Sequence, residues 1–221
     1  KEKADLGIVV DPDVDRLALV CEDGSMFGEE YTLVACADYV LGKIKGNTVS
    51  NLSSSRALRD VTEKHGGKYQ ASAVGEVNVV ELMKSSNAVI GGEGNGGIIY
   101  PKSHYGRDSL VGVVLFLSHL ANLKISCKQL RDSYPNYFMS KNKIELTQDI
   151  NVDLILEIIA LNYKNEDVII IDGVKINFKS EWVHLRKSNT EPIIRIYTES
   201  TSQISADTLA KRFITEIKNI I

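Results

Sequence analysis

The sequence predicts an α/β protein: a mixed-sheet α/β domain followed by an α+β domain with a mainly antiparallel sheet. Strand-like and helix-like segments alternate up to about residue 134, and this alternation is typical of an α/β layer. After Pro135, strand-like segments follow one another with few helices between them, which favours an antiparallel sheet. The chain has 221 residues, of which 43% are hydrophobic, and this is enough for two small packed cores.

The N-terminal part is expected to begin with two buried apolar strands, 6–10 and 17–21, joined by an acidic loop and followed by a turn at 22–25. The alternating segment comes next. We expect helices at 30–42, 55–65, 76–83 and 108–123, strands at 48–52, 68–73, 88–90 and 98–100, and a short helix at 127–133.

The C-terminal part has a different order of elements. We expect one long strand and one helix, then four further strands and a closing helix. These elements are the strand 137–146, the helix 152–161, the strands 168–171, 175–178, 182–185 and 193–199, and a helix that begins at Ser205.

Charge and hydropathy argue against two kinds of partner. The net charge is −3 at pH 7, and no run of lysines and arginines interleaved with aromatic residues occurs, so the electrostatic footprint of a nucleic-acid-binding protein is missing. The longest apolar run, 110–117, is too short to span a bilayer and is followed by polar residues. We therefore expect neither nucleic acid nor a membrane as a partner.

The cysteines and the first residues indicate the compartment. Cys21, Cys36 and Cys127 are odd in number and far apart in the sequence, so they fit neither a disulfide framework nor a zinc site. A reducing cytoplasm is the expected location. No secretory signal precedes the first strand. The chain opens with Lys1-Glu2-Lys3 and runs straight into that strand, which leads us to expect a piece of a longer protein.

An acidic loop follows the first strand and contains Asp11, Asp13 and Asp15 at alternating positions. In an extended backbone these three carboxylates would point the same way. Three carboxylates at one spot repel each other unless a cation joins them, and hard oxygen donors suit Mg²⁺. Arg16, the next residue, could hold a phosphate. The sequence therefore predicts a magnesium site beside a phosphate contact.

Two other interpretations of this loop remain open. It could be a solvated acidic turn, because aspartate favours loop conformations. It could also belong to a phosphatase of the haloacid dehalogenase type, with Asp11 as the nucleophile and Asp13 as the acid. Such an enzyme needs a later acidic pair for its metal, and no GDxxxD-like string follows in the sequence.

A glycine-rich loop spans 90–98 and contains five glycines, one carboxylate and one amide between two strands. Glycines at this density let the backbone approach a ligand closely. The only side-chain handles are Glu93 and Asn95, and a carboxylate and an amide are good partners for neighbouring sugar hydroxyls. The alternative is a flexible hairpin in which the glycines serve turn geometry alone.

A basic and hydroxyl-rich loop joins the last two strands and predicts a phosphate site. An arginine offers a planar fork to a phosphate, while hydroxyls, an amide and loop N–H groups can fill the remaining oxygens. A polar turn is the alternative. The candidate phosphate-binding residues are Arg186, Ser188, Asn189 and Thr190 in the loop and Arg195 on the following strand.

Taken together, the strings DPDVDR, GEGNGG and RKSNTEP, in this order, resemble the α-D-phosphohexomutase family, whose four domains carry a metal loop, a sugar loop and a phosphate loop. The resemblance covers nearly the whole chain. It implies that residues 1–29 are the C-terminal piece of domain 2 with the metal loop. Residues 30–134 would be domain 3 with the sugar loop, and residues 135–221 domain 4 with the phosphate loop.

The resemblance also implies a role for each candidate residue. Asp11, Asp13 and Asp15 would bind Mg²⁺ together with a phosphoserine, and Arg16 would contact the phosphate that is transferred. Glu93 and Asn95 would hold sugar hydroxyls. The phosphate that does not react would be held by Arg186, Ser188, Asn189 and Thr190, with Arg195 beside them.

The activity implied is transfer of phosphate between C1 and C6 of a hexose phosphate, with hexose 1,6-bisphosphate as intermediate and activator. The family's nucleophile is a serine in a Ser-His-Asn-Pro string that these residues lack, so we expect the N-terminal domains to be missing and the chain alone to be inactive. The loop sequences suggest glucosamine phosphate, or mannose and glucose phosphates, as substrate. A phosphosugar-binding module without chemistry is a further alternative.

Overall fold

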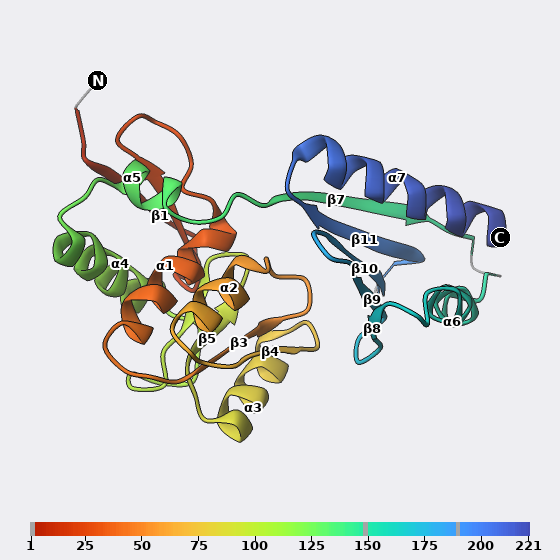
Figure 1. The fold of residues 1–221 in the computed structure, drawn as a ribbon, viewed down its shortest axis with the longest axis horizontal. Coiled ribbons are helices and arrows are strands. Elements are labelled where there is room, and N and C mark those ends of the chain that lie inside the picture. The colour runs from red at the N-terminus through yellow and green to blue at the C-terminus, as the bar shows by residue number, and fades with distance from the viewer. Residues whose placement is uncertain (1–2, 148–149, 189–190) are drawn as a thin grey trace. The chain divides into compact units, whose positions relative to one another are not determined.

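The computed structural model describes residues 3–147, 150–188 and 191–221. It divides into two compact units, Lys1–Pro135 and Asn136–Ile221 (Figure 1). Every predicted helix and strand is present within the described residues, with bounds that differ from the expected ones by at most three residues.

The first unit begins with a hairpin of β1 (Leu6–Val10) and β2 (Leu17–Cys21), in which Val10 pairs with Leu17. Only β2 is buried, so the expectation of two buried strands is wrong for β1. Leu17 and Leu19 are 1% exposed, whereas Val9 of β1 is 54% exposed. The reason is that β2 packs against helix α1, while β1 lies on the outer side of the hairpin with β2 as its only strand neighbour among the described residues.

A four-stranded mixed sheet forms the centre of this unit, in the order β4-β3-β5-β6. The strand β3 pairs in parallel with β4 and β5, and β6 returns antiparallel to β5, which confirms the predicted mixed sheet. The elements are α1 (Glu29–Leu41), β3 (Asn47–Asn51), α2 (Ala57–Lys64), β4 (Tyr69–Ser72), α3 (Glu76–Ser86), β5 (Ala88–Glu93), β6 (Gly97–Ile99), α4 (Ser109–Leu123) and α5 (Cys127–Asp132).

The strand β5 is longer than expected because it runs through Gly91 and Gly92 to Glu93. These glycines pair with β6 and were expected to lie in the loop. A Cβ atom at Gly91 would lie 2.5 Å from the sulfur of Met83, so the absence of a side chain lets helix α3 pack closely on the strand. As a result Glu93 is fixed at the end of a strand rather than in a mobile turn.

The second unit is a five-stranded antiparallel sheet in the order β7-β11-β10-β9-β8, with two helices. This confirms the predicted α+β domain. Its elements are β7 (Phe138–Glu145), α6 (Val152–Asn162), β8 (Asp167–Ile169), β9 (Val174–Asn177), β10 (Trp182–Lys187), β11 (Ile193–Ser200) and α7 (Gln203–Ile220).

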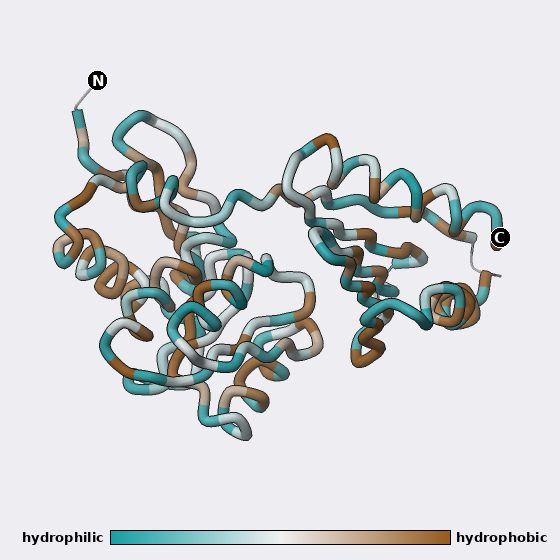
Figure 2. Tube along the Cα trace, in the orientation of Figure 1, coloured by the Kyte–Doolittle hydropathy of each residue, from teal (hydrophilic) through white to brown (hydrophobic). Residues whose placement is uncertain are grey.

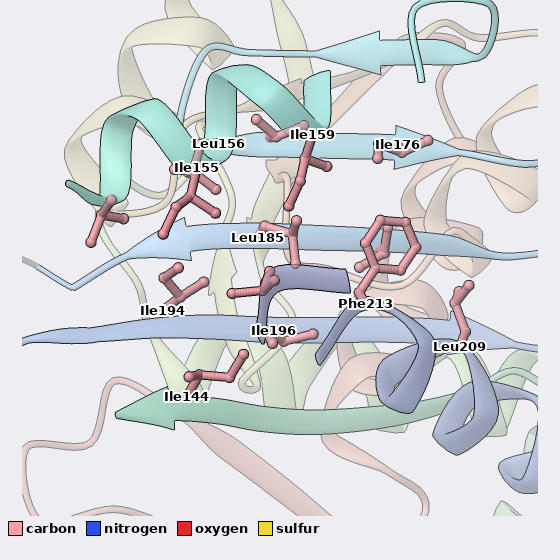
Figure 3. Packing of buried hydrophobic residues seen from close by; sticks show 14 residues of the cluster. Ile144, Ile155, Leu156, Ile159, Ile176, Leu185, Ile194, Ile196, Leu209 and Phe213 are labelled. Carbon is pink, nitrogen blue, oxygen red and sulfur yellow. The ribbon is translucent and has the colours of Figure 1, made fainter. Parts of the chain in front are cut away.

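Both helices of this unit cover the same face of the sheet, where apolar side chains from the strands meet Ile159 of α6 and Phe213 of α7 (Figure 3). Figure 2 shows α6 as a strongly apolar segment. Because side chains alternate along a strand, Ile194 and Ile196 point into this core and Arg195 points to the other face. Arg195, and Arg186 opposite it on β10, therefore lie on the face that these helices leave uncovered.

Two features bear on the predicted environment. The three cysteines lie buried in the first unit as free thiols, with the sulfur atoms of Cys21 and Cys127 3.4 Å apart. In the part of the chain that the structure describes, no helix combines the length and the apolar character needed to cross a bilayer.

Candidate active site

The acidic loop between β1 and β2 is a compact turn. The N–H of Val14 donates to the carbonyl of Asp11 (3.0 Å), and Val14 has a positive φ of 58°. The carboxylate of Asp11 accepts hydrogen bonds from the N–H groups of Asp15 (3.2 Å) and Arg16 (3.0 Å). One ligand oxygen from each of Asp11, Asp13 and Asp15 lies within 4.8 Å of the others. The three carboxylates converge as predicted, but a turn brings them together instead of an extended backbone.

The electrostatics of this loop differ between its aspartates. Although desolvation acts to raise it, the pKa of Asp11 is lowered by hydrogen bonds, first among them the one from the N–H of Arg16. Burial raises the pKa of Asp15; the positive charge of Arg107 acts against this rise, and the negative charge of Asp13 adds to it. Burial first, and the negative charge of Asp13 in addition, therefore make the ionised state of Asp15 costly, and a bound cation would offset this cost.

The donor set fits a hard divalent cation. All three groups are carboxylates, which Mg²⁺ prefers over nitrogen or sulfur ligands. The Oδ1 atom of Asp15 is buried and has no hydrogen-bond partner among the described residues, with Arg16 Nε 3.7 Å away. A buried carboxylate oxygen without a partner is an unfavourable arrangement that a bound cation would relieve.

Two other segments of the first unit hold the acidic loop in place. The N–H of Leu17 donates to the carbonyl of Gly96 in the glycine-rich loop (3.0 Å). The hydroxyl of Ser109, at the start of α4, donates to the carbonyl of Val14 (2.8 Å). The candidate metal loop and the candidate sugar loop are thus joined through their backbones.

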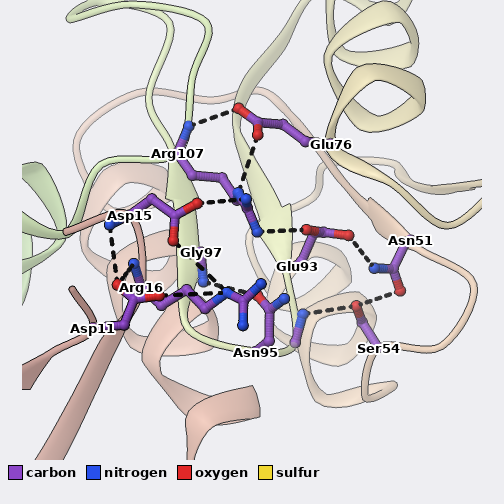
Figure 4. Close-up of polar contacts among 11 residues, drawn as sticks. Asp11, Asp15, Arg16, Asn51, Ser54, Glu76, Glu93, Asn95, Gly97 and Arg107 are labelled. Atoms are coloured by element: carbon purple, nitrogen blue, oxygen red, sulfur yellow. Dashed lines mark hydrogen bonds and ion pairs between the residues drawn. The ribbon is translucent and has the colours of Figure 1, made fainter. Parts of the chain in front are cut away.

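The glycine-rich loop is the turn between β5 and β6. Both carboxylate oxygens of Glu93 are held: Oε1 accepts from the Asn51 amide (2.8 Å) and Oε2 from Arg107 (3.1 Å) (Figure 4). The side chain of Asn95 accepts a hydrogen bond from the N–H of Gly97 (3.2 Å), so it stabilises the turn itself. Glu93 is consequently the better oriented of the two predicted sugar contacts.

Sequence reasoning missed the residue at the centre of this region, Arg107. Its Nε donates to Glu76 (3.1 Å) and its NH1 donates to Glu93, while NH2 forms an ion pair with Asp15 (Figure 4). The available signal was electrostatic: a cluster of carboxylates in one unit requires basic partners, and Arg107 lies in the segment between the glycine-rich loop and α4.

The predicted phosphate residues belong to the second unit. Arg186 of β10 lies directly opposite Arg195 of β11 in the sheet register, and Arg195 lies opposite Lys143 of β7. Arg186 Nε donates to the carboxylate of Asp172 (3.0 Å), whereas Arg195 is 41% exposed and has its NH2 3.9 Å from Glu191. These three basic residues therefore form a row across one face of the sheet. Sequence reasoning identified the two arginines of this row but not Lys143.

The loop itself is described in part. Ser188 is nearly buried, and its N–H donates to the carbonyl of Ile193 (3.1 Å). The predicted Asn189 and Thr190 lie outside the described residues.

A histidine supports the base of this loop. His184 on β10 is buried, and its Nε2–H donates to the backbone carbonyl of Asp172 (2.7 Å). Burial lowers the pKa of His184 to about 4, with the neighbouring charges of Lys175 and Arg186 acting in the same direction. Asp172 thus holds two residues of β10 at once, one through its carbonyl and one through its carboxylate.

Comparisons with known proteins agree with this architecture. Residues 28–137 match the family model for phosphoglucomutase/phosphomannomutase α/β/α domain III, and residues 140–216 match the model for the C-terminal domain of the same proteins. A phosphoglucosamine/phosphogalactosamine mutase from Sulfurisphaera tokodaii is 34% identical over 99% of this chain and 48% of its own length.

Two solved structures show the same fold. A phosphoglucomutase/phosphomannomutase family protein from Burkholderia thailandensis superposes with a TM-score of 0.84 and 24% identity over 98% of this chain and 47% of that one. An N-acetylphosphoglucosamine mutase from Aspergillus fumigatus, solved with GlcNAc-6P and magnesium, gives a TM-score of 0.68 and 14% identity over 95% of this chain and 51% of that one.

The family models and the curated relative from Sulfurisphaera tokodaii are named for sugar-phosphate mutases, which are a type of isomerase. The chain belongs to the α-D-phosphohexomutase family. It corresponds to the C-terminal part of the family's proteins and contains domain III and the C-terminal domain. It spans about half the length of the curated relatives that it matches.

Proposed function

We propose that this chain supplies the cation, sugar and phosphate sites of a phosphohexomutase. The enzyme moves phosphate between C1 and C6 of a hexose phosphate through a phosphoserine and a hexose 1,6-bisphosphate. One observation carries the proposal: the acidic loop and the glycine-rich loop, about 80 residues apart in the sequence, are joined by backbone and side-chain contacts into one network of the first unit.

The acidic loop is the proposed cation site, with Asp11, Asp13 and Asp15 as its protein ligands. A bound Mg²⁺ would supply the positive charge that offsets the charge of a phosphoryl group in transfer. Arg16 follows the ligands directly, and its side chain is 49% exposed, so its guanidinium is available to a phosphate oxygen.

The glycine-rich loop is the proposed sugar site. Glu93 keeps unused lone pairs on both oxygens, because a carboxylate accepts about four hydrogen bonds in total and two of its donors are known. Asn95 is assigned beside it as a second contact for hydroxyl groups. A hydroxyl grip at the middle of the sugar tolerates both orientations of a 1,6-bisphosphate, which the reaction requires.

The loop after β10 is the proposed site for the phosphate that does not react. Arg186 is oriented by Asp172, and Arg195 lies opposite it on the next strand. We also assign Ser188, Asn189 and Thr190 to the binding of this phosphate. Two guanidinium groups on one sheet face give planar, bidentate donors for a phosphate at the far end of the substrate.

The substrate is proposed to be glucosamine phosphate, with mannose and glucose phosphates as the alternatives. The similarity to the Sulfurisphaera tokodaii mutase supports the first, and the family models cover the others. Three free thiols agree with a reducing cytoplasm as the location. The 221 residues contain no Ser-His-Asn-Pro string, so the chain by itself is expected to be inactive.

The family assignment argues against the haloacid dehalogenase alternative, which would use Asp11 as a nucleophile. In addition, the side chain of Asp11 accepts two backbone hydrogen bonds within its own loop, a contact pattern that suits a structural ligand. A binding module without chemistry would hold the same ligands and would show no turnover.

The experiment is a coupled assay of the full-length gene product with Mg²⁺ on glucosamine 6-phosphate, mannose 1-phosphate and glucose 1-phosphate. We expect conversion to the isomeric phosphate, fastest with glucosamine 6-phosphate, and at least a 100-fold loss in Asp13→Asn. Binding of all three compounds without any conversion would instead establish the binding module.

A further inference from the structure

One guanidinium group connects the two candidate ligand sites of the first unit. We propose that Arg107 is a positioning residue for both of them: its planar fork orients Glu93 toward sugar hydroxyls, and its charge sets how tightly the acidic loop holds a divalent cation. The inference rests on the proposed function, from which it takes the two ligands.

Arg107 contacts three carboxylates from three different segments. These are Asp15 in the acidic loop, Glu76 at the start of α3 and Glu93 at the end of β5. The side chain of Arg107 is 15% exposed, so these ion pairs are shielded from bulk water. Such a guanidinium has few other conformations available, and its partners are correspondingly fixed.

Two neighbouring residues, Gly97 and Glu76, fix the position of the Arg107 side chain. A Cβ atom at Gly97 would lie 2.5 Å from Cδ of Arg107, so the arginine occupies the space that a side chain at position 97 would need. The backbone N–H of Arg107 donates to Glu76 Oε1 (3.0 Å), and Nε donates to Glu76 Oε2. Glu76 therefore anchors the base of the arginine and directs NH1 and NH2 toward the two candidate sites.

On the cation side, Arg107 and the proposed ion share Asp15. Arg107 takes Oδ2, while Oδ1 has no hydrogen-bond partner among the described residues. The positive charge of Arg107 repels an incoming cation and lowers its affinity, although Arg107 leaves Oδ1 without a hydrogen-bond donor from the described part of the chain. Removing the charge should consequently strengthen cation binding.

On the sugar side, Arg107 has the opposite effect. The carboxylate of Glu93 is oriented by Arg107 on one oxygen and by Asn51 on the other, and it is buried. A lysine has the charge but not the fork, and cannot reproduce contacts to three carboxylates at once. Loss of the fork should therefore weaken hydroxyl binding whether or not the charge is kept.

These two roles can be separated by two substitutions in the full-length gene product. Mn²⁺ affinity is measured by electron paramagnetic resonance, and glucosamine 6-phosphate affinity by calorimetry without divalent cation, so that no turnover is needed. Arg107→Met should bind Mn²⁺ about tenfold more tightly, and Arg107→Lys should stay within threefold of the wild type. Both variants should bind glucosamine 6-phosphate about tenfold more weakly.

Arg59→Met is the matched control, because Arg59 is a partly exposed arginine of the same unit outside this network. It should leave both affinities unchanged. The inference is overturned if the wild type binds no Mn²⁺, if Arg107→Met weakens both ligands together as a general loss of structure would, or if neither affinity changes more than twofold. Turnover is assayed separately, so a gene product with this binding pattern but no phosphate interconversion would refute the proposed function alone.

Discussion

The acidic site of the first unit and the basic row of the second unit are built in opposite ways. Asp15, Glu93 and Arg107 come from three separate segments and meet only when the unit has folded. Arg186 and Arg195 lie on neighbouring strands joined by one loop, so a single hairpin brings them together. The comparison teaches that the first site depends on tertiary packing between distant segments, whereas the second depends on the pairing of two neighbouring strands.

The chain carries a separate reporter for each unit. Trp182 is the only tryptophan and lies buried in the second unit. All three cysteines are buried in the first unit, where burial raises the pKa of Cys36 to about 12 and suppresses its reactivity. Tryptophan fluorescence therefore follows the second unit, and thiol labelling follows the first.

The largest effect is expected from Gly96→Ala. Gly96 has a φ of 87°, and an added Cβ atom would overlap the carbonyl of Leu17. The N–H of this same Leu17 donates to the carbonyl of Gly96 and so joins the two loops of the first site. Backbone strain and overpacking together should lower the free energy of unfolding of the first unit by about 4 kcal/mol. The measurement is thiol labelling across a urea series.

Gly24→Ala is the control for this prediction. Gly24 has a similar φ of 85°, but no atom lies within 4 Å of an added Cβ. It should cost only about 1 kcal/mol. Equal losses in the two variants would show that the contact between the loops contributes nothing to stability, and the contrast between the two units would then fail.

The next effect is a loss of stability of the second unit in acid. The pKa of His184 is lowered to about 4 in the folded state, so the folded state binds fewer protons than the unfolded one. Stability is complete above the unfolded pKa of about 6.5, decreases as the pH falls toward 4, and changes no further below it; the total is about 3 kcal/mol. Urea unfolding followed by Trp182 fluorescence at pH 7 and pH 4.5 measures this loss.

His184→Gln separates the histidine from the other titrating groups of the unit. A glutamine amide can still donate to the carbonyl of Asp172 but does not titrate. The acid-dependent loss in this variant should be smaller by about the amount assigned to His184. An unchanged pH dependence would mean that other residues cause it.

The smallest effect on stability is expected from Arg186→Lys. Its side chain is 26% exposed, so loss of the pair with Asp172 should change the free energy of unfolding by less than about 1 kcal/mol. The affinity of the full-length gene product for glucosamine 6-phosphate should nevertheless fall about tenfold, because a lysine lacks the bidentate fork. Calorimetry and Trp182 fluorescence measure the two quantities.

Arg212→Lys, on α7 of the same unit, is the matched control and should leave the affinity unchanged. A large loss of stability in Arg186→Lys would show that this arginine is part of the structural framework of the second unit. The local character of the basic row would then be disproved.

The order of the helices and strands could be predicted because each has a local pattern of apolar and polar residues along the sequence. Ile194, Arg195 and Ile196 alternate between core and surface, and the pattern is visible without the fold. The exposure of β1 could not be predicted, since its apolar residues look like those of a buried strand and the difference lies in what packs on each side of the hairpin.

The candidate site divides in the same way. Asp11, Asp13 and Asp15 are close in sequence, so their convergence was predictable, although the turn that causes it depends on the positive φ of Val14. The role of Arg107 was not predictable, because it depends on the space that the absence of a side chain at Gly97 leaves for the arginine. Such a contact between distant segments leaves no periodic signal in the sequence.

The central claim is that these loops serve transfer of a phosphoryl group between two positions of one sugar rather than its release to water. The most direct test is ³¹P NMR of the full-length gene product with Mg²⁺ and glucosamine 6-phosphate in ¹⁸O-labelled water. We predict formation of the 1-phosphate with no ¹⁸O in either ester. Release of inorganic phosphate that carries ¹⁸O, without any 1-phosphate, would contradict the account.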